Sequence, residues 1–373
     1  MAVGCVARVS TMSSVRSIFL LGATGYVGGS LLVTLLREYP SATISTLVRN
    51  SRSSGAIKSL SPDRINIVLG SHSDTSIIES EVEKADLTIN AANCDDLDLT
   101  KSIINGFKKK SKGYLNSYNV GYLRIDHLKT GILWVYSGSA VVLAEEATGP
   151  FLGKLDERGQ KIWDDTKTED LRAISPSALH RSVDLAVLGA HDSGILDAYI
   201  ICPGLIYGPG IGPVKSTSIQ VPLLLQVALR RRQAYFAGEG TNIWCNIHIQ
   251  DLLRIYTHVI KHAFTSAGST ARVDSYDNYY FAAGSEDATK DVAEAIATAL
   301  YEKELVDSPH AQSLSPEDPD GKLLAMYLGH TSRAISVRAK SLGWSPKEKK
   351  LTESEVMSIE VDNFLKTTEA TSH

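Results

Sequence analysis

Two spacings of apolar residues alternate along the first 200 residues, and together they predict a repeated strand–helix pattern. Short apolar runs predict strands at residues 17–21, 43–48, 65–69, 86–91, 132–136 and 197–202. Apolar residues at helical spacing predict helices at residues 25–37, 97–110 and 171–190, and Ser175-Pro176 must kink or start the last of these. Parallel strands joined by helices form a sheet that is covered on both faces. The pattern therefore predicts an α/β fold with a doubly wound parallel sheet over residues 17–203.

The regular alternation of predicted strands and helices ends after Pro203, and residues 208–213 are rich in glycine and proline. Helices are predicted at residues 221–232, 252–263, 292–302 and 332–342, and short strands at residues 235–237, 244–247 and 279–282. Residues 308–321 are expected to form a loop. Residues 204–373 are thus predicted to form a smaller mixed lobe that binds a substrate and returns some elements to the sheet.

A glycine-rich turn joins the first predicted strand to the first predicted helix, in the sequence Gly22-Ala-Thr-Gly25-Tyr-Val-Gly28. In such a turn the first glycine allows a tight bend, and the second lets the backbone approach a pyrophosphate. The third lets the helix pack close to the strand. Phosphates then bind the free N–H groups at the helix N-terminus. The turn indicates a Rossmann domain that binds a dinucleotide.

The end of the second predicted strand carries Arg49 and has no Asp or Glu. In NAD sites an acidic residue here accepts hydrogen bonds from the ribose 2′-hydroxyl. An arginine instead pairs with a 2′-phosphate. NADP is therefore expected in preference to NAD, although NAD is not excluded.

The spacing of the glycines and four later segments resemble the extended short-chain dehydrogenase/reductase superfamily, which includes epimerases and dehydratases. The four segments are residues 86–93, 203–210, 246–252 and 342–346, and Cys202 stands where the family's second segment usually begins with Arg. The resemblance implies an NAD(P)-binding oxidoreductase or an epimerase/dehydratase-like enzyme. The residues expected to bind the cofactor are Gly22, Thr24, Gly25, Tyr26, Val27, Gly28, Arg49, Ala91, Ala92, Asn93, Pro203 and Leu205.

The catalytic residues of that superfamily are only partly matched. The family uses a serine with a Tyr-x-x-x-Lys pair, but no Tyr of this chain has Lys four positions later. Ser139 matches the serine, while His180 and Asp184 stand at the Tyr and Lys positions. Residues four apart on a helix can touch, so Asp184 could orient His180 as the proton donor. The alternative is a non-catalytic NAD(P)-binding regulator, similar to the nitrogen-repression regulators of fungi.

Composition restricts the remaining possibilities. The net charge of −4 over 373 residues gives no sign of a nucleic-acid surface. No apolar run is long enough to span a membrane, and the four cysteines are scattered without metal-ligand spacing. We therefore expect a cytoplasmic monomer or homodimer that acts on a small molecule and binds no metal, nucleic acid or membrane. Residues 1–16 are expected to be a disordered tail, Asp251 a helix N-cap, and Arg230–Arg232 a solvated helix end.

Overall fold

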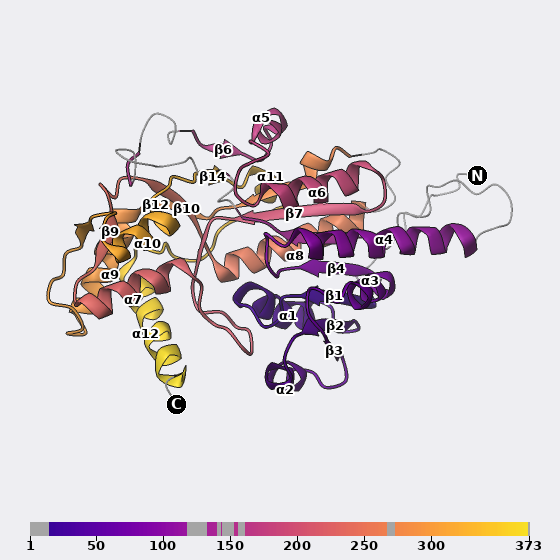
Figure 1. The fold of residues 1–373 in the computed structure, drawn as a ribbon, viewed down its shortest axis with the longest axis horizontal. Coiled ribbons are helices and arrows are strands. Elements are labelled where there is room, and N and C mark those ends of the chain that lie inside the picture. The colour runs from indigo at the N-terminus through magenta and orange to yellow at the C-terminus, as the bar shows by residue number, and fades with distance from the viewer. Residues whose placement is uncertain are drawn as a thin grey trace, which may run out of the picture.

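The computed structural model describes residues 15–117, 133–139, 143, 153–155, 161–266 and 273–371, and most of the expected tail lies outside them. Its centre is a seven-stranded parallel sheet in the order β11-β7-β5-β4-β1-β2-β3 (Figure 1). These strands are β1 (Ser17–Leu21), β2 (Thr43–Val48), β3 (Ile65–Leu69), β4 (Leu87–Asn90), β5 (Leu133–Ser137), β7 (Asp197–Pro203) and β11 (Tyr279–Ala282). The predicted doubly wound sheet is confirmed.

Helices cover both faces of this sheet, as the apolar runs require. One face carries α3 (Thr75–Lys84), α4 (Leu97–Ser117) and α6 (Arg181–Asp192), and the other carries α1 (Tyr26–Glu38) and α8 (Ile249–Ser266). Strand β1 shows the reason. Ile18 and Leu20 belong to one apolar core and Phe19 and Leu21 to the other, because successive side chains of a strand point to opposite faces.

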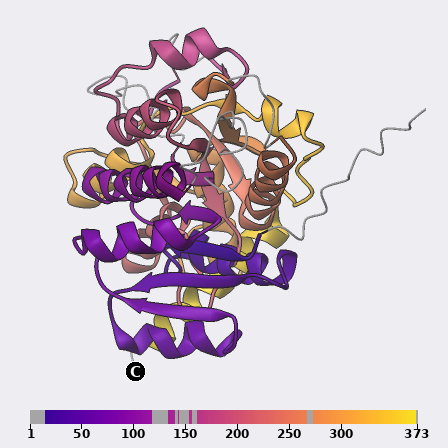
Figure 2. The same ribbon diagram turned by 90° about the vertical axis from the view of Figure 1, so that its right-hand side faces the viewer.

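The second lobe is a smaller mixed structure around a third apolar core. One sheet pairs β8 (Leu205–Tyr207), β10 (Ile243–His248) and β12 (Ser285–Ala288), and another pairs β9 (Tyr235–Ala237) with β13 (Gln312–Leu314). Helices α7 (Gln220–Arg231), α9 (Thr289–Tyr301), α10 (Pro319–Leu328) and α12 (Ser354–Thr371) surround these strands. Figure 2, turned by 90° from Figure 1, shows the indigo and purple N-terminal elements gathered together in the lower part of the view.

The remaining elements include four differences from the sequence predictions. The expected helix 171–190 is two helices, α5 (Thr168–Ala173) and α6, with Pro176 in the turn between them. Residues 308–321 contain β13 and the start of α10 rather than only a loop. Residues 332–342 form β14 (Ala334–Ile335), which pairs with β6 (Trp163–Asp164), and the short helix α11 (Val337–Ser341). Helices α2 (Ser51–Ser59), α3, α10 and α12 were not expected. Of the helices described, none is both long and apolar enough to cross a membrane.

Candidate active site

The glycine turn has the tight geometry that its sequence predicts. Gly22 has φ +89°, and a Cβ on it would lie 2.3 Å from the carbonyl oxygen of Ala91. A Cβ on Gly28 would lie 2.2 Å from the carbonyl oxygen of Gly22. Both glycines are therefore required for the strand, the helix and the loop after β4 to pack together.

The N-terminus of α1 is open toward the carboxyl edge of the sheet. Gly25 is the N-cap residue, and no side chain caps the helix there. A Cβ on Gly25 would meet only the carbonyl oxygen of Gly22, at 3.2 Å. Uncapped backbone N–H groups at a helix N-terminus bind phosphate groups. Thr24 and Val27 are half-buried beside this turn, whereas Tyr26 is buried and donates a hydrogen bond to the carbonyl oxygen of Gly208 (2.5 Å).

Arg49 lies exposed directly after β2. Asn50 then caps α2 by accepting a hydrogen bond from the Arg52 N–H (2.6 Å). No hydrogen bond or ion pair with another described residue is seen at the Arg49 guanidinium. Its charge is thus free to meet a ligand at this end of the sheet.

The loop after β4 runs beside the glycine turn. Ala91 contacts Gly22, and Asn90 Oδ1 accepts the N–H of Ala92 (3.1 Å). Asn93 Oδ1 accepts the N–H of Asp95 (3.1 Å). These hydrogen bonds hold Ala91, Ala92 and Asn93 at the carboxyl edge, where doubly wound sheets bind their ligands.

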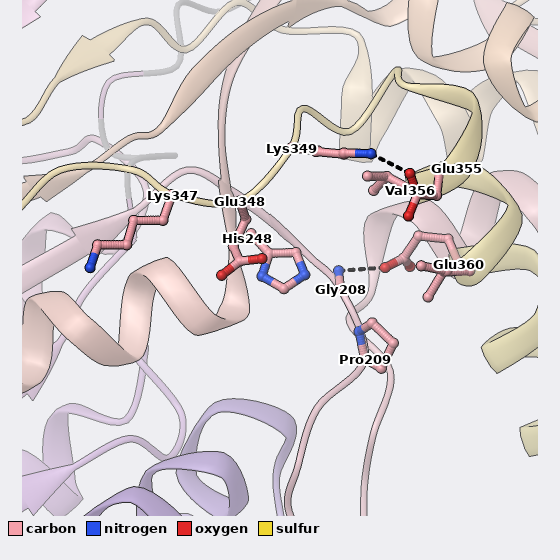
Figure 3. A pocket seen from close by; sticks show the side chains of 10 residues that line it. Gly208, Pro209, His248, Lys347, Glu348, Lys349, Glu355, Val356 and Glu360 are labelled. Atoms are coloured by element: carbon pink, nitrogen blue, oxygen red, sulfur yellow. Dashed lines mark hydrogen bonds and ion pairs between the residues drawn. The ribbon is translucent and has the colours of Figure 1, made fainter.

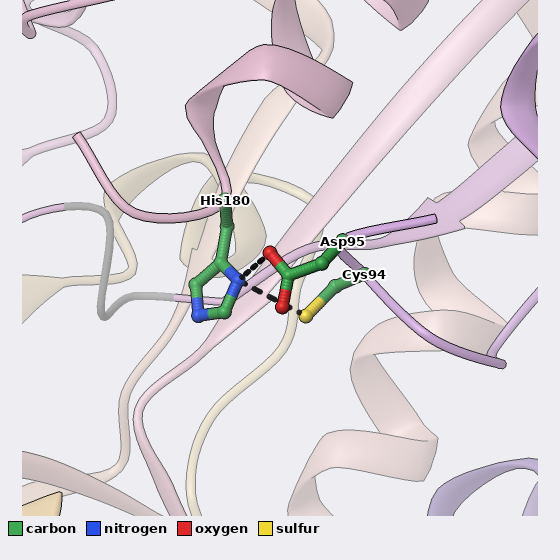
Figure 4. A group of neighbouring side chains, drawn as sticks. All are labelled: Cys94, Asp95 and His180. Atoms are coloured by element: carbon green, nitrogen blue, oxygen red, sulfur yellow. Dashed lines mark hydrogen bonds and ion pairs between the residues drawn. The ribbon is translucent and has the colours of Figure 1, made fainter. Parts of the chain in front are cut away.

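His180 projects onto this same loop. Its Nδ1 lies 2.6 Å from Asp95 Oδ1 and 3.3 Å from Cys94 Sγ (Figure 4). His180 has φ +68° and is the N-cap of α6, where its carbonyl oxygen accepts the Asp184 N–H (3.5 Å), but its ring contacts Asp95 while the Asp184 carboxyl accepts from Tyr279. The predicted side-chain contact with Asp184 is therefore wrong. Asp95, which takes that place, was missed because it lies 85 residues away in the sequence.

Cys94 completes this cluster. Its carbonyl oxygen accepts a hydrogen bond from the Tyr136 hydroxyl (2.8 Å). Burial, followed by the charge of Asp95, raises the pKa of the Cys94 thiol to about 12. The thiol is thus protonated at neutral pH in this state.

Asp184 lies fully buried behind the cluster. Its Oδ2 accepts a hydrogen bond from the Tyr279 hydroxyl (2.7 Å) and lies 3.8 Å from the buried Arg181 guanidinium. The Cys202 thiol donates to the same Tyr279 oxygen (3.1 Å). Burial raises the pKa of Asp184 to about 7. This carboxyl anchors α6 to β7 and β11, and it supplies no positive charge where the family has Lys.

The other predicted site residues lie near the same edge. Ser139 follows β5 and is half-buried. Pro203 ends β7 and pairs with Ala282 of β11. Leu205 is different, since its side chain is buried in the core of the second lobe. Only its backbone is therefore suited to contact a ligand at this edge.

Two further expectations are corrected by the structure. Asp251 lies inside α8, where its carboxylate accepts the N–H groups of Lys347 (2.9 Å) and Glu348 (3.1 Å) and pairs with Arg254. It is therefore not an N-cap, but it fastens the loop before α12. The run Arg230–Arg232 is not simply solvated, because its guanidinium groups pair with Asp307, Asp318 and Asp320.

A cavity of about 350 Å³ lies between Gly208 and the C-terminal helix α12 (Figure 3). At its base Glu360 accepts a hydrogen bond from the Gly208 N–H, and burial raises the pKa of Glu360 to about 7. His248 forms the facing wall, and burial lowers its pKa. The carbonyl oxygen of Gly208 thus accepts a hydrogen bond from Tyr26 of α1, and its N–H donates one to Glu360 of α12.

Comparisons with known proteins agree with this architecture. Residues 14–110 match the model of the NmrA-like family. The chain is 25% identical to the oxidase ucsJ of an Acremonium species, over 89% of this chain and 93% of the relative. It is 23% identical to an uncharacterized Saccharomyces cerevisiae protein, YLL056C, over 89% of this chain and 95% of that protein.

Two solved structures show the same fold. One is a dTDP-glucose 4,6-dehydratase of Bacillus anthracis in complex with NAD, with a TM-score of 0.59 and 17% identity, covering 95% of this chain and 98% of that one. The other is a UDP-glucose 4-epimerase of Thermotoga maritima with UDP-glucose, with a TM-score of 0.59 and 15% identity, covering 95% and 100%. The chain thus has the same fold as these dehydratase and epimerase structures, in agreement with the resemblance drawn from the sequence, and residues 14–110 are similar to the NmrA-like family.

Proposed function

We propose that this chain is an NAD(P)-dependent oxidoreductase that prefers NADPH and transfers hydride to or from a small carbonyl or hydroxyl compound. The observation that carries the proposal is the Asp95–His180 pair, 2.6 Å apart, at the sheet edge that also bears the glycine turn. A histidine oriented by a carboxylate is a common proton carrier. The name of one relative, an oxidase, and the NAD in a structural neighbour support the same class.

The residues present fit a dinucleotide. Gly25 leaves the first turn of α1 uncovered, which suits the pyrophosphate. Arg49, exposed after β2, suits a 2′-phosphate. The backbone of Ala91–Asn93 and of Pro203 would face the rest of the cofactor. Nicotinamide supplies the hydride chemistry when it is bound.

The chain's own residues would handle the proton. Asp95 accepts the Nδ1–H of His180, which leaves Nε2 as the atom that exchanges a proton with the substrate oxygen. Ser139, after β5, would donate a hydrogen bond to the same oxygen and so orient it. This assignment keeps His180 and Ser139 in the roles expected from the sequence and replaces Asp184 by Asp95 as the orienting carboxylate.

The proposal is tested by turnover of NADPH or NADP⁺ with a panel of small aldehydes, ketones and alcohols. His180→Ala should lower turnover about 100-fold or more, the usual effect of losing a general acid, with little change in NADPH affinity. Asp95→Asn should lower it less. The matched control is His72→Ala, because His72 forms a similar pair with Asp96 (2.9 Å) outside the cluster. A wild-type rate for His180→Ala would contradict the proposal.

One observation favours a non-catalytic NAD(P)-binding regulator instead. The residue at the family's Lys position, Asp184, is buried and bonded to Tyr279, so it offers no cation to the nicotinamide ribose. A crystal structure with NADPH would separate the two functions. A nicotinamide C4 that faces His180 and Ser139 supports the enzyme. A nicotinamide directed away from both residues supports the regulator.

A further inference from the structure

Cys94, Asp95 and His180 bring three different metal-ligand atoms together. Cys94 Sγ, an Asp95 carboxylate oxygen and a His180 ring nitrogen all lie within 4.8 Å of one another. The three side chains point toward one another from two elements, the loop after β4 and the residue before α6 (Figure 4). Within the described part of the chain, this is the one group of three such residues close enough to hold an ion.

The backbone around the group holds these ligands in place. The Tyr136 hydroxyl binds the Cys94 carbonyl oxygen (2.8 Å), and Asn93 Oδ1 accepts the Asp95 N–H (3.1 Å). The left-handed backbone of His180 turns its ring onto the loop (φ +68°). An ion could enter from solvent, because half of the Asp95 side chain is exposed (50%) while His180 is largely covered (12%).

We propose that this group binds a divalent transition metal, with zinc as the best fit. Zinc prefers thiolate, imidazole and carboxylate ligands, and three protein ligands with an open fourth position are typical of its non-structural sites. The bond lengths of tetrahedral zinc put ligand atoms roughly 3.3–3.6 Å apart. The sulfur–nitrogen distance of 3.3 Å already fits. The nitrogen–oxygen distance of 2.6 Å must widen by under about 1 Å, which the exposed Asp95 side chain allows.

Binding has a defined proton balance. Zinc replaces the proton on Cys94 Sγ, which passes to solvent, and the ring proton of His180 moves from Nδ1 to Nε2. The metal is then bonded to His180 Nδ1, the atom that pairs with Asp95 in the proposed proton transfer. If His180 is the proton carrier, as the proposed function states, zinc would inhibit the enzyme. Metal binding itself does not depend on that function.

Binding is tested on the full-length, untagged protein after chelator treatment, with no cofactor or substrate. Titration with Co²⁺ should produce a near-ultraviolet thiolate-to-cobalt absorption band that saturates at one equivalent of Co²⁺. Added Zn²⁺ should then displace the Co²⁺ and remove the band. Cys94→Ser should abolish the band, and Asp95→Asn should weaken affinity at least about tenfold. His72→Gln changes the neighbouring His–Asp pair, and it should leave both the absorption band and the metal affinity unchanged.

A second measurement uses the wild-type chain, so that a misfolded variant does not decide the outcome. Zn²⁺ should slow the alkylation of Cys94 by iodoacetamide. The rate is measured by mass spectrometry of the peptide that contains Cys94. The absence of a thiolate band, a band that persists in Cys94→Ser, or alkylation unaffected by Zn²⁺ would each overturn the site. Zinc binding without inhibition of turnover would instead count against His180 as the proton carrier and leave the metal site intact.

Discussion

The three glycines of the glycine turn, Gly22, Gly25 and Gly28, differ in how much space surrounds them. At Gly22 and Gly28 an added Cβ would lie within 2.3 Å of a backbone oxygen, so these positions are needed for folding. At Gly25 the nearest atom is 3.2 Å away, and the backbone is extended (φ −85°, ψ 172°). At Gly25 a side chain would thus require a shift of only a few tenths of an ångström at the Gly22 carbonyl, and it would obstruct the proposed ligand.

Replacing Gly25 with Val should therefore remove dinucleotide binding without unfolding the protein. The branched side chain would occupy the space through which the pyrophosphate approaches α1. Calorimetric titration with NADPH measures the loss, and thermal unfolding checks the fold. Gly55→Ala is the control, because no atom lies within 4 Å of its added Cβ. Unchanged NADPH affinity in Gly25→Val would contradict the dinucleotide site.

Arg49→Gln should change the choice of cofactor. A charge-assisted hydrogen bond to a 2′-phosphate contributes about 1.5–3 kcal/mol, so NADPH affinity should fall roughly tenfold or more. NADH affinity should barely change, since NADH lacks that phosphate. Arg52→Gln, at an exposed position in the first turn of α2, is the matched control. An equal loss of both cofactors would show that Arg49 has a structural role instead.

At the scale of elements, α6 is joined to β7 and β11 by a buried chain of hydrogen bonds. Asp184 of α6 accepts from Tyr279 of β11, and Cys202 of β7 donates to the same hydroxyl. Cys202 and Asp184 are two departures from the family's sequence motifs, and Tyr279 links them. The two unusual residue types therefore belong to one buried hydrogen-bonded group.

Tyr279→Phe tests this link. The change leaves a buried carboxylate oxygen of Asp184 without its hydroxyl donor, which typically costs about 1–3 kcal/mol of unfolding free energy. Urea unfolding measures the difference. Tyr301→Phe should have no effect, because Tyr301 is exposed at the end of α9 (48%). Equal stability of Tyr279→Phe and the wild type would show that the hydrogen bond contributes nothing net.

At the scale of the whole molecule, the C-terminal helix α12 and the helix α1, which follows the glycine turn, meet at one residue. Gly208 accepts from the Tyr26 hydroxyl of α1 and donates to Glu360 of α12. Glu360 is buried, and burial raises its pKa from 4.5 to about 7. The second lobe is therefore fastened to the part that holds the parallel sheet through a carboxyl whose pKa is raised to near neutral pH.

Glu360→Gln should change how stability depends on pH. Because the folded-state pKa of Glu360 is raised, its contribution is fully present below about pH 4.5 and is lost as pH rises through about 7. The whole effect is roughly 3 kcal/mol at most. Glutamine keeps an acceptor for the Gly208 N–H but does not titrate. The free energy of unfolding of Glu360→Gln, measured relative to that of the wild type, should thus be larger at pH 8 than at pH 5. A constant difference between variant and wild type would contradict the raised pKa.

Much of the fold could be predicted from local sequence. The strands at residues 17–21, 43–48 and 65–69 have the predicted bounds, because a buried parallel strand is a continuous apolar run with clear ends. The helix α10 was missed, although Asp318 as its N-cap and Pro319 at its first position are local signals of a helix start. Gly321 and the surrounding acidic residues hid the apolar spacing.

The sequence by itself determined the parallel sheet, the glycine turn and the absence of an acid beside Arg49, since each depends on residues that are neighbours along the chain. Only the tertiary structure decided the partner of His180. Helices α4 and α6 pack against each other on one face of the sheet, and this brings Asp95, just before α4, to His180, just before α6, across 85 residues. It also decided that Asp184 is buried against Tyr279. Periodicity reports which face of an element is buried, but the residue that meets a side chain there depends on which strands and helices pack together.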